Sequence, residues 1–432
     1  MSQQVSEALE ALRNLGTPDE IRDLARQEQA PSPLPRVNSH VHLPPNFSAF
    51  ESVEQAVNLA AEQGLAVLGV SNYYDYQVYG DFVHRARLRG IFPLFGTEII
   101  CLDDALRDAG IKINDPGNPG KIYFCGKGIT RFDELTPTAT ELLATIRRND
   151  STRMAQMVQR MASRFAAGGL NTSIDEAAVV EMVVRRHGSA RETVYLQERH
   201  ISQAFQEALF ENVPPEERIE RLNQILDAAT KAKHPDDFVT MQNDIRSHLM
   251  KAGKPAFVDE TFVSFDDARR LILELGGVPC YPTLVDGTSP LCQFEASPER
   301  LIAEIKSRNL QAAEWIPIRN KIAVLREYAT QMRAAGLVLT AGTEHNTLDL
   351  IPLDPFCADG EMPDDLRALF WEGACVMAGH QFLTLHGECG FVDSTGLPNP
   401  DYTSADERIQ TFARIGAAVM RRYHEAYRGK PL

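Results

Sequence analysis

The sequence predicts a protein of the α/β class, built either as a barrel of strands or as a doubly wound sheet. Short apolar runs typical of buried strands alternate with amphipathic runs at helical spacing over residues 36–129, and the same alternation returns over 263–346. Between these stretches, residues 138–253 are mostly helical and polar. We therefore expect a series of βα units that a helical insertion interrupts.

The elements follow in order. Residues 4–29 predict helices, with Thr17 as the N-cap of the second and Pro18 in its first turn, and a proline-rich connection at 30–36 leads into the first strand. The next helices are expected at 53–64 and 81–90, and strands at 65–74, 91–102 and 120–129. After the insertion, helices are expected at 264–277, 297–310 and 322–336, strands at 278–284, 312–318 and 337–346, and a last helix at 405–427.

Composition excludes several classes of function. The formal net charge of −15 leaves no basic excess to neutralise phosphates, so we expect neither nucleic-acid binding nor attachment to an anionic membrane. No apolar run approaches the roughly 20 residues that span a bilayer, and the first 16 residues do not resemble a signal peptide. The seven cysteines are scattered without CxxC spacing, as is typical of reduced thiols, so we expect a cytoplasmic protein.

Ionisable and polar side chains stand where several expected strands end. His40 and His42 are two residues apart in "RVNSHVHLPP", a spacing that points both imidazoles to the same side of a strand. Glu98 lies in "FGTEII", and Glu344 and His345 lie in "AGTEHN". The strand ends of an α/β barrel form its active-site face, so these groups are expected to converge.

These motifs, in this order, resemble the polymerase-and-histidinol-phosphatase (PHP) superfamily of metal-dependent phosphoesterases. His-x-His opens the similarity, which runs over about residues 36–346. The other landmarks are "LAVLGVSNYYD", "PLFGTEI", "IYFCGKGI", "ERHISQAF", the segment ending in "LELGGVPCYP" and "MRAAGLVLTAGTEHN". The resemblance implies a distorted (βα)7 TIM-like barrel of PHP type with the helical insertion and a C-terminal extension.

The sequence also departs from the family pattern. The family typically holds three metals through about nine ligands, but Tyr73, Tyr123 and Tyr281 stand where it has histidines. The closing aspartate is Glu344, and the aspartate expected soon after His-x-His has no counterpart. Tyrosine is a poor ligand for zinc or magnesium at neutral pH, because its phenol has a pKa near 10. The resemblance thus implies one metal rather than three.

The implied site combines this metal with residues for substrate. One divalent ion (Zn, Mn or Fe) would be held by His40, His42, Glu98 and Glu344. Catalytic roles are expected for His345, Tyr281 and Tyr73, and substrate contacts for His200, Arg199, Arg319, Lys127 and Tyr123. The plainer alternative makes the tyrosines pocket wall, His200 a surface residue at a helix start, and Arg319 and Lys127 solvated. No nucleotide cofactor is expected, because no P-loop spacing occurs.

The leading functional hypothesis is a metal-dependent hydrolase of the phosphoesterase class, acting on a small phosphorylated or anionic substrate through metal-activated water. Two alternatives stay open: a mononuclear metal-dependent lyase or isomerase of a sugar acid, and a non-catalytic ligand-binding descendant of the fold. We expect a helical segment and linker at 1–35, the barrel at 36–350 and a C-terminal extension at 351–432 packed on it. A homo-oligomer is compatible with the sequence.

Overall fold

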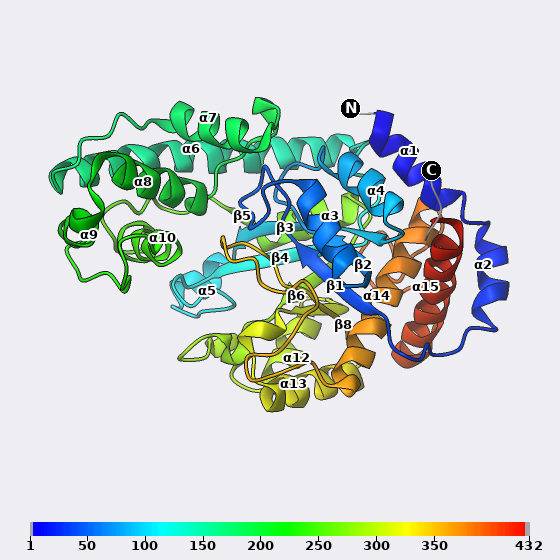
Figure 1. The fold of residues 1–432 in the computed structure, drawn as a ribbon. Coiled ribbons are helices and arrows are strands. Elements are labelled where there is room, and N and C mark those ends of the chain that lie inside the picture. The colour runs from blue at the N-terminus through cyan, green and yellow to red at the C-terminus, as the bar shows by residue number, and fades with distance from the viewer. Residues whose placement is uncertain (1–2, 428–432) are drawn as a thin grey trace.

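The protein is a mixed α/β barrel, described here from a computed structural model that covers residues 3–427 (Figure 1). Its strands follow the order β1-β2-β3-β4-β6-β7-β8, with β5 paired to β3. The strands are β1 (Arg36–Val41), β2 (Leu65–Val70), β3 (Phe92–Leu102), β4 (Lys121–Lys127), β5 (Val263–Ser264), β6 (Val278–Pro282), β7 (Ala312–Trp315) and β8 (Val338–Ala341).

The helices lie outside this sheet. They are α1 (Gln3–Arg13), α2 (Pro18–Ala25), α3 (Val53–Glu62), α4 (Tyr79–Leu88), α5 (Asp104–Asp108), α6 (Pro137–Ala167), α7 (Glu176–His187), α8 (Glu198–Asn212), α9 (Arg218–Leu226), α10 (Phe238–Ile245), α11 (Phe265–Glu274), α12 (Pro298–Ser307), α13 (Ile322–Ala334), α14 (Asp364–Leu385) and α15 (Ala405–Tyr427). Short 3-10 turns add η1 (Arg191–Thr193), η2 (Pro215–Glu217), η4 (Val285–Gly287), η5 (Gln293–Glu295) and η6 (Pro317–Arg319), and one π turn forms η3 (Arg246–Met250).

The barrel closes between its first and last strands. Val41 and Glu344 form a parallel bridge, and the backbone N–H of His42 donates to the carbonyl oxygen of Glu344 at 2.9 Å. Most neighbouring strands are parallel, as the βα alternation predicts. The exception is β4, which is antiparallel to both β3 and β6. The β3–β4 connection holds only the short helix α5, so the chain turns back instead of crossing over the sheet.

The strand burial explains why the sequence reads as apolar runs. Strands β7 and β8 are buried along their whole length, and β3 is buried at all but one position. Helix α14 packs against β1, β3 and β8, and α15 packs against α14 and α2. At the N-terminus, Thr17 and Glu20 form the capping box of α2.

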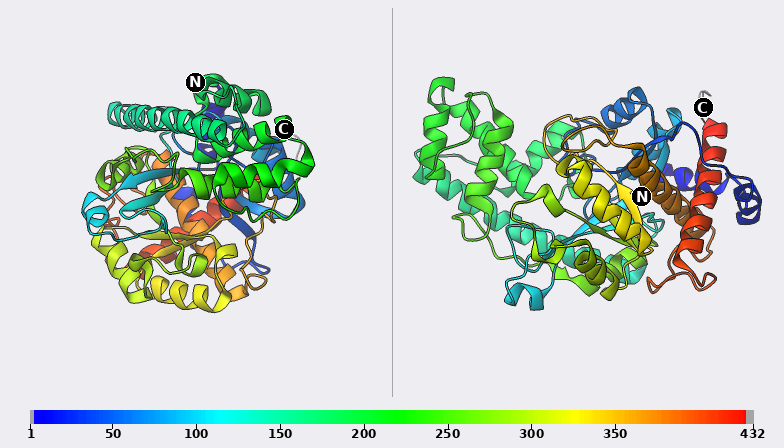
Figure 2. Two further views of the ribbon diagram at one scale, coloured as in Figure 1. Left: turned by 90° about the vertical axis from the view of Figure 1, so that its left-hand side faces the viewer. Right: turned by 90° about the horizontal axis from the view of Figure 1, so that it is seen from below.

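The segment between β4 and β5 builds a second hydrophobic cluster of its own, which includes Met157, Phe165, Phe205, Ile225 and Met241. Its helices extend to one side of the barrel, as two further views show (Figure 2). These helices run from α6, which starts at Pro137, to η3, which ends at Met250. No helix in residues 3–427 combines the length and the apolar character needed to cross a bilayer.

Candidate metal site and substrate cavity

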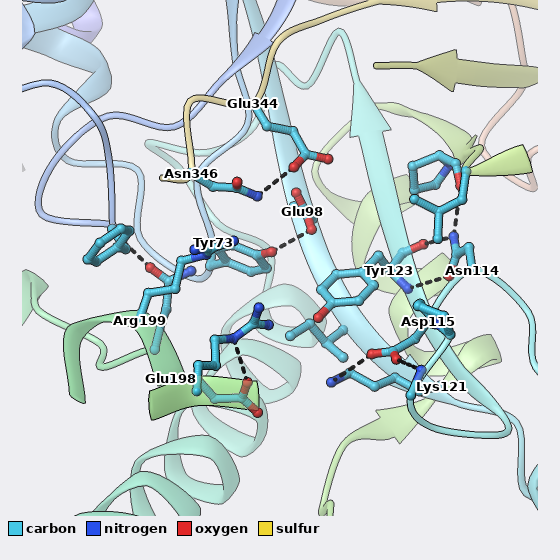
Figure 3. Close-up of a pocket in the computed structure, with 18 of the residues that line it drawn as sticks. Tyr73, Glu98, Asn114, Asp115, Lys121, Tyr123, Glu198, Arg199, Glu344 and Asn346 are labelled. Carbon is cyan, nitrogen blue, oxygen red and sulfur yellow. Dashed lines mark hydrogen bonds and ion pairs between the residues drawn. The ribbon is translucent and has the colours of Figure 1, made fainter. Parts of the chain in front are cut away.

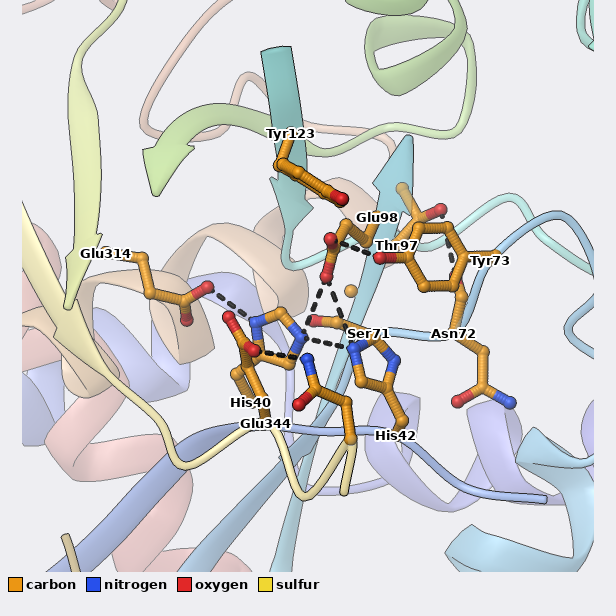
Figure 4. A network of polar contacts seen from close by, with 12 residues as sticks. His40, His42, Ser71, Asn72, Tyr73, Thr97, Glu98, Tyr123, Glu314 and Glu344 are labelled. Carbon is orange, nitrogen blue, oxygen red and sulfur yellow. Dashed lines mark hydrogen bonds and ion pairs between the residues drawn. The ribbon is translucent and has the colours of Figure 1, made fainter. Parts of the chain in front are cut away.

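Three side chains converge at one end of the barrel: His40 and His42, at the end of β1, and Glu98, from the middle of β3 (Figure 4). The Nε2 atoms of the two histidines are 3.4 Å apart, and each lies 3.3 Å from Oε2 of Glu98. All three residues are buried. The two imidazoles therefore lie on the same side of the strand, as the His-x-His spacing predicts. With the carboxylate oxygen of Glu98, their Nε2 atoms form a nearly equilateral triangle.

The triangle has the dimensions and chemistry of a divalent metal site. Ligand atoms about 2.0–2.1 Å from a tetrahedral zinc ion are separated by about 3.3–3.4 Å, which is the edge observed here. Oε2 of Glu98 is buried, and its polar contacts among the described residues are the two imidazole Nε2 atoms at 3.3 Å, so a metal ion between the three would compensate its burial. Two imidazoles and one carboxylate also match the three-ligand zinc sites of hydrolases, which keep one position open for water or substrate. The residues present fit a metal ion.

Neighbouring groups orient the triangle. Nδ1 of His40 donates to Oε2 of Glu314 at 2.6 Å, which leaves the Nε2 lone pair directed at the triangle. The hydroxyl of Tyr73 donates to Oε1 of Glu98, so the other carboxylate oxygen faces the histidines. The ring of Tyr73 also stacks on His42 at a centroid distance of 5.2 Å. Nδ1 of His42 has no such partner within the described chain.

The electrostatics of this corner favour a positive charge. Burial disfavours the charged imidazole, but the carboxylate of Glu314 outweighs it and raises the pKa of His40 to about 9. Burial likewise opposes ionisation of Glu98, yet hydrogen bonds from His40 and His42 hold the pKa of that carboxyl below its ordinary value. Two acids around two histidines thus stabilise a cation, whether that is a proton or a metal ion.

A second donor group, His40, Cys125 and Glu314, lies deeper in the barrel. Lys127 already supplies its cation, because its Nζ lies 2.6 Å from Oε1 of Glu314 and 3.4 Å from Nδ1 of His40. Burial raises the pKa of the Cys125 thiol well above its ordinary value, so sulfur stays protonated. Of the two donor groups, the Glu98 triangle is therefore the one that better fits a metal ion.

Glu344, predicted as the fourth ligand, lies outside the triangle. Its carboxylate accepts two hydrogen bonds from Arg319, at 2.9 and 2.5 Å, and one from Nδ2 of Asn346 at 2.5 Å. Both Glu344 and His345 have left-handed backbone conformations, with φ of +58° and +52°. The chain reaches this turn through Gly342, where a Cβ atom would lie 2.3 Å from Cβ of His40, so only glycine allows the approach.

A cavity of about 550 Å³ opens beside the triangle, between the barrel and the helical insertion (Figure 3). Glu98 and Tyr73 form part of its wall. Six basic and five acidic side chains line it, although the formal net charge of the protein is −15. The basic residues are Lys121, Arg153, Arg199, Arg246, Lys251 and Arg319, and the acidic ones are Glu98, Asp115, Asp150, Glu198 and Glu344.

Four of the predicted catalytic and substrate residues line this cavity: Tyr73, Tyr123, Arg199 and Arg319. The guanidinium of Arg199 hydrogen-bonds to Oδ1 of Asn243 at 3.3 Å and has no carboxylate partner within residues 3–427. Burial, followed by repulsion from Arg246, lowers the pKa of Arg199 to about 9. Arg199 therefore offers its charge to the cavity.

The other four lie away from the cavity lining. Tyr281 donates to Oε1 of Glu295 at 2.9 Å, and Lys127 is held by Glu314. His200 accepts the backbone N–H of Gln197 through Nδ1 at 3.1 Å.

His345 contacts Oγ1 of Thr343 through Nδ1 at 2.7 Å and the carbonyl oxygen of Ile351 through Nε2 at 3.0 Å, and it stacks on Phe50. A role as general base would require its ring to leave both partners. Asn346, and not His345, lines the cavity together with Glu344.

Sequence reasoning missed Glu314, Arg246 and Lys251. The signal for Glu314 was present, since it is a single acid inside the apolar strand "AAEW", and a buried carboxylate requires a partner. Arg246 and Lys251 read as ordinary solvated residues of a polar helical segment. Only the packing of the insertion over the barrel brings them into the cavity.

No family model matches the sequence, and a search of curated proteins finds no match. Among solved structures, a protein from Bifidobacterium adolescentis assigned as a metal-dependent phosphoesterase is similar over 78% of this chain and 95% of its own, with a TM-score of 0.50 and 15% identity. An amidohydrolase from Chromobacterium violaceum, solved with bound sulfate and no metal, covers 74% of this chain and 93% of its own, with a TM-score of 0.48 and 18% identity. The first similarity shows that the barrel architecture is shared.

Proposed function

We propose that the protein is a metal-dependent hydrolase that acts on a small anionic substrate, with a phosphate ester as the favoured class. The observation that carries this proposal is the triangle of His40, His42 and Glu98, with edges of 3.3–3.4 Å, in the wall of a cavity lined by six basic side chains. A bound divalent ion supplies Lewis acidity and lowers the pKa of bound water to roughly 7.

The chain's own residues bind and orient the substrate. Arg199 offers a guanidinium without a carboxylate partner in the described chain, and Arg319 and Asn346 offer donors beside Glu344. Burial raises the pKa of both Tyr73 and Tyr123, so each phenol keeps its proton. Tyr73 donates that proton to Oε1 of Glu98, whereas the Tyr123 hydroxyl is available as a donor to the substrate. Planar guanidinium groups suit the oxygens of a phosphate, which favours phosphorylated substrates over uncharged ones.

The fold supports this proposal, since the barrel is shared with a protein assigned as a metal-dependent phosphoesterase. One feature is also compatible with a sugar-acid lyase or isomerase, because Arg199 and Arg319 would attract a carboxylate ligand as well. The two hypotheses differ in the bond that is broken, so substrate tests separate them.

Metal content decides the first step. We expect about one transition metal per chain in the wild-type protein by plasma mass spectrometry, and loss of this metal in His40→Ala. His234→Ala is the matched control, because His234 is an exposed histidine of the insertion with its side chain 72% exposed. The proposal would be refuted by wild-type protein that holds no metal after incubation with Zn²⁺, Mn²⁺ or Fe²⁺, and two or more metals would contradict a single site.

Turnover decides the second step. The metal-loaded protein should hydrolyse aryl phosphates, and both His40→Ala and Glu98→Gln should abolish this activity while His234→Ala retains it. If aryl phosphates are not hydrolysed and sugar acids instead raise the melting temperature, the lyase or isomerase hypothesis replaces the hydrolase.

A further inference from the structure

The cavity has a second concentration of positive charge, far from the metal triangle. Figure 3 shows Glu198 and Lys121 at the end opposite Glu344, with Tyr123 between them and Glu98. At this end, Oε2 of Glu198 accepts hydrogen bonds from Nε of Arg246 at 2.9 Å and from Nζ of Lys251 at 2.8 Å. We call Arg246 and Lys251 the basic end of the cavity.

The strand register gives the separation between Glu98 and Lys121, which lies with Glu198 at the end opposite Glu344. In the β3–β4 ribbon, Glu98 is paired with Cys125 and Leu102 with Lys121. The two pairs are four residues apart, which corresponds to about 13 Å along the backbone. Side chains at alternate positions face the same side, so Glu98 and Ile100 on β3, and Lys121 and Tyr123 on β4, all line the cavity. One phosphate group therefore cannot contact both Glu98 and Lys121.

The basic end retains unused hydrogen-bond donors. A guanidinium has five N–H groups and an ammonium has three. Within residues 3–427, the side chain of Arg246 makes only the bond from Nε to Glu198, and that of Lys251 makes only one bond, to the same oxygen. Their side chains are 24% and 23% exposed, and both residues line the cavity. The terminal nitrogens of Arg246 are thus free to bind a ligand.

The acids at this end do not cancel these charges. Asp115 and Glu260 pair with Lys121 at 3.3 and 3.1 Å, and Glu198 is shared between Arg246, Lys251 and Arg153.

Asp150 also lines the cavity, and burial raises its pKa to about 7, so it is partly neutral at physiological pH. Burial and the like charges of Arg246 and Lys121 hold the pKa of Lys251 down to about 8, although Glu198 opposes this. An added anion would relieve this crowding of positive charge.

Resting on the proposed function, we propose that the substrate is an elongated molecule with two anionic groups. One group would react at the metal triangle, and the other, a phosphate or a carboxylate, would be held by Arg246 and Lys251. The middle of the molecule would pass Ile100 and Tyr123. The insertion would thereby set the length and charge of the substrate.

Calorimetry with two-headed anions tests this inference. We would titrate the metal-loaded protein with alkanediphosphonates of increasing chain length and with alkylphosphonates of matching length, which carry one anionic group. Affinity should peak at one length and exceed that of the one-headed ligand at least tenfold. The double variant Arg246→Gln/Lys251→Met should lose this advantage. Alkanedicarboxylates of the same lengths show whether the basic end prefers phosphonate or carboxylate.

The matched control is Arg148→Gln/Lys254→Met, which removes two exposed charges of the insertion that do not line the cavity. It should bind as the wild type does. If the Arg246/Lys251 double variant unfolds, the single variant Lys251→Met leaves Glu198 with two cationic partners and allows the same comparison.

Absence of any advantage for two-headed ligands, or equal binding by the wild type and the Arg246/Lys251 variants, would overturn the inference. Failure of the proposed function is a different result: no metal binds and His40→Ala leaves diphosphonate binding unchanged, while the Arg246/Lys251 variant still weakens it. That result would support anion binding at the basic end and contradict the metal site.

Discussion

Substitution of Glu314 by glutamine should damage both the fold and the metal site. Glu314 is fully buried and joins two basic side chains, with Oε1 2.6 Å from Nζ of Lys127 and Oε2 2.6 Å from Nδ1 of His40. Glutamine keeps the volume but removes the charge, which leaves the buried Lys127 ammonium with neutral acceptors, among them the carbonyl oxygen of Ser39 and the hydroxyl of Ser71.

The magnitude follows from this geometry. Leaving one partner of a buried ion pair without its counter-charge costs about 3–5 kcal/mol, a large share of the roughly 5–15 kcal/mol that stabilises a typical domain. We expect the free energy of unfolding in urea to fall by that amount. Glu304→Gln is the control, since its pair with Arg308 at 2.8 Å is partly exposed and should be worth less than about 1 kcal/mol.

The double variant Lys127→Met/Glu314→Gln distinguishes a charge effect from a packing effect. Because it removes both charges, it should be more stable than Glu314→Gln. Metal affinity, measured by competition with a chelator, should fall 10–100-fold in Glu314→Gln, because His40 loses the acceptor that orients its ring. Unfolding energies within 1 kcal/mol of wild type for Glu314→Gln, or strictly additive effects in the double variant, would refute the reasoning.

Three further substitutions test other parts of the structure. Burial lowers the pKa of His345 to about 4, so protonation favours unfolding. The contribution of the neutral His345 side chain to the free energy of unfolding is complete above pH 6.5 and is lost as the pH falls toward 4. Denaturation at several pH values should show that the difference in the free energy of unfolding between wild type and His345→Gln narrows by up to about 3 kcal/mol as the pH falls from 6.5 to 4. A difference that does not change with pH would contradict this assignment. Tyr73→Phe should keep the stacking on His42 but weaken metal binding roughly tenfold by freeing Oε1 of Glu98, and unchanged affinity in chelator competition would count against that role. Gly373→Ala should destabilise by about 1–3 kcal/mol, because its Cβ would lie 1.8 Å from the carbonyl oxygen of Leu339, and an unchanged melting temperature would show that α14 can shift from β8.

Local patterns were sufficient for much of the fold. The His40-x-His42 spacing on a strand leads directly to two imidazoles on one side, and Thr17 followed by Pro18 marks the start of α2 as observed. The direction of β4 could not be read in the same way. A strand buried on both faces has the same apolar pattern in a parallel and an antiparallel sheet, so its reversal becomes visible only in the register.

The site required information that local patterns do not carry. Lys127 and Glu314 are 187 positions apart, and nothing in "CGKG" or "AAEW" indicates that each neutralises the other. The residue spacing after β8 also did not show which side chain faces the cavity. Two successive left-handed residues, Glu344 and His345, turn the histidine toward Phe50 and place Asn346 at the cavity wall.

These same side-chain cations give a physical reason to expect one metal rather than several. Beyond the triangle, the acids nearest to it already have a cation supplied by the chain: Lys127 lies 2.6 Å from Glu314, and Arg319 holds both oxygens of Glu344. A second divalent ion at either carboxylate would have to displace an ammonium or a guanidinium group and leave it without a counter-charge, at a cost of several kcal/mol when buried. Glu98 differs from both, because within residues 3–427 its Oε2 faces only His40 and His42. Lys127→Met and Arg319→Met would remove these built-in cations, so an increase in bound metal in either variant would identify the side chain that takes the place of an ion.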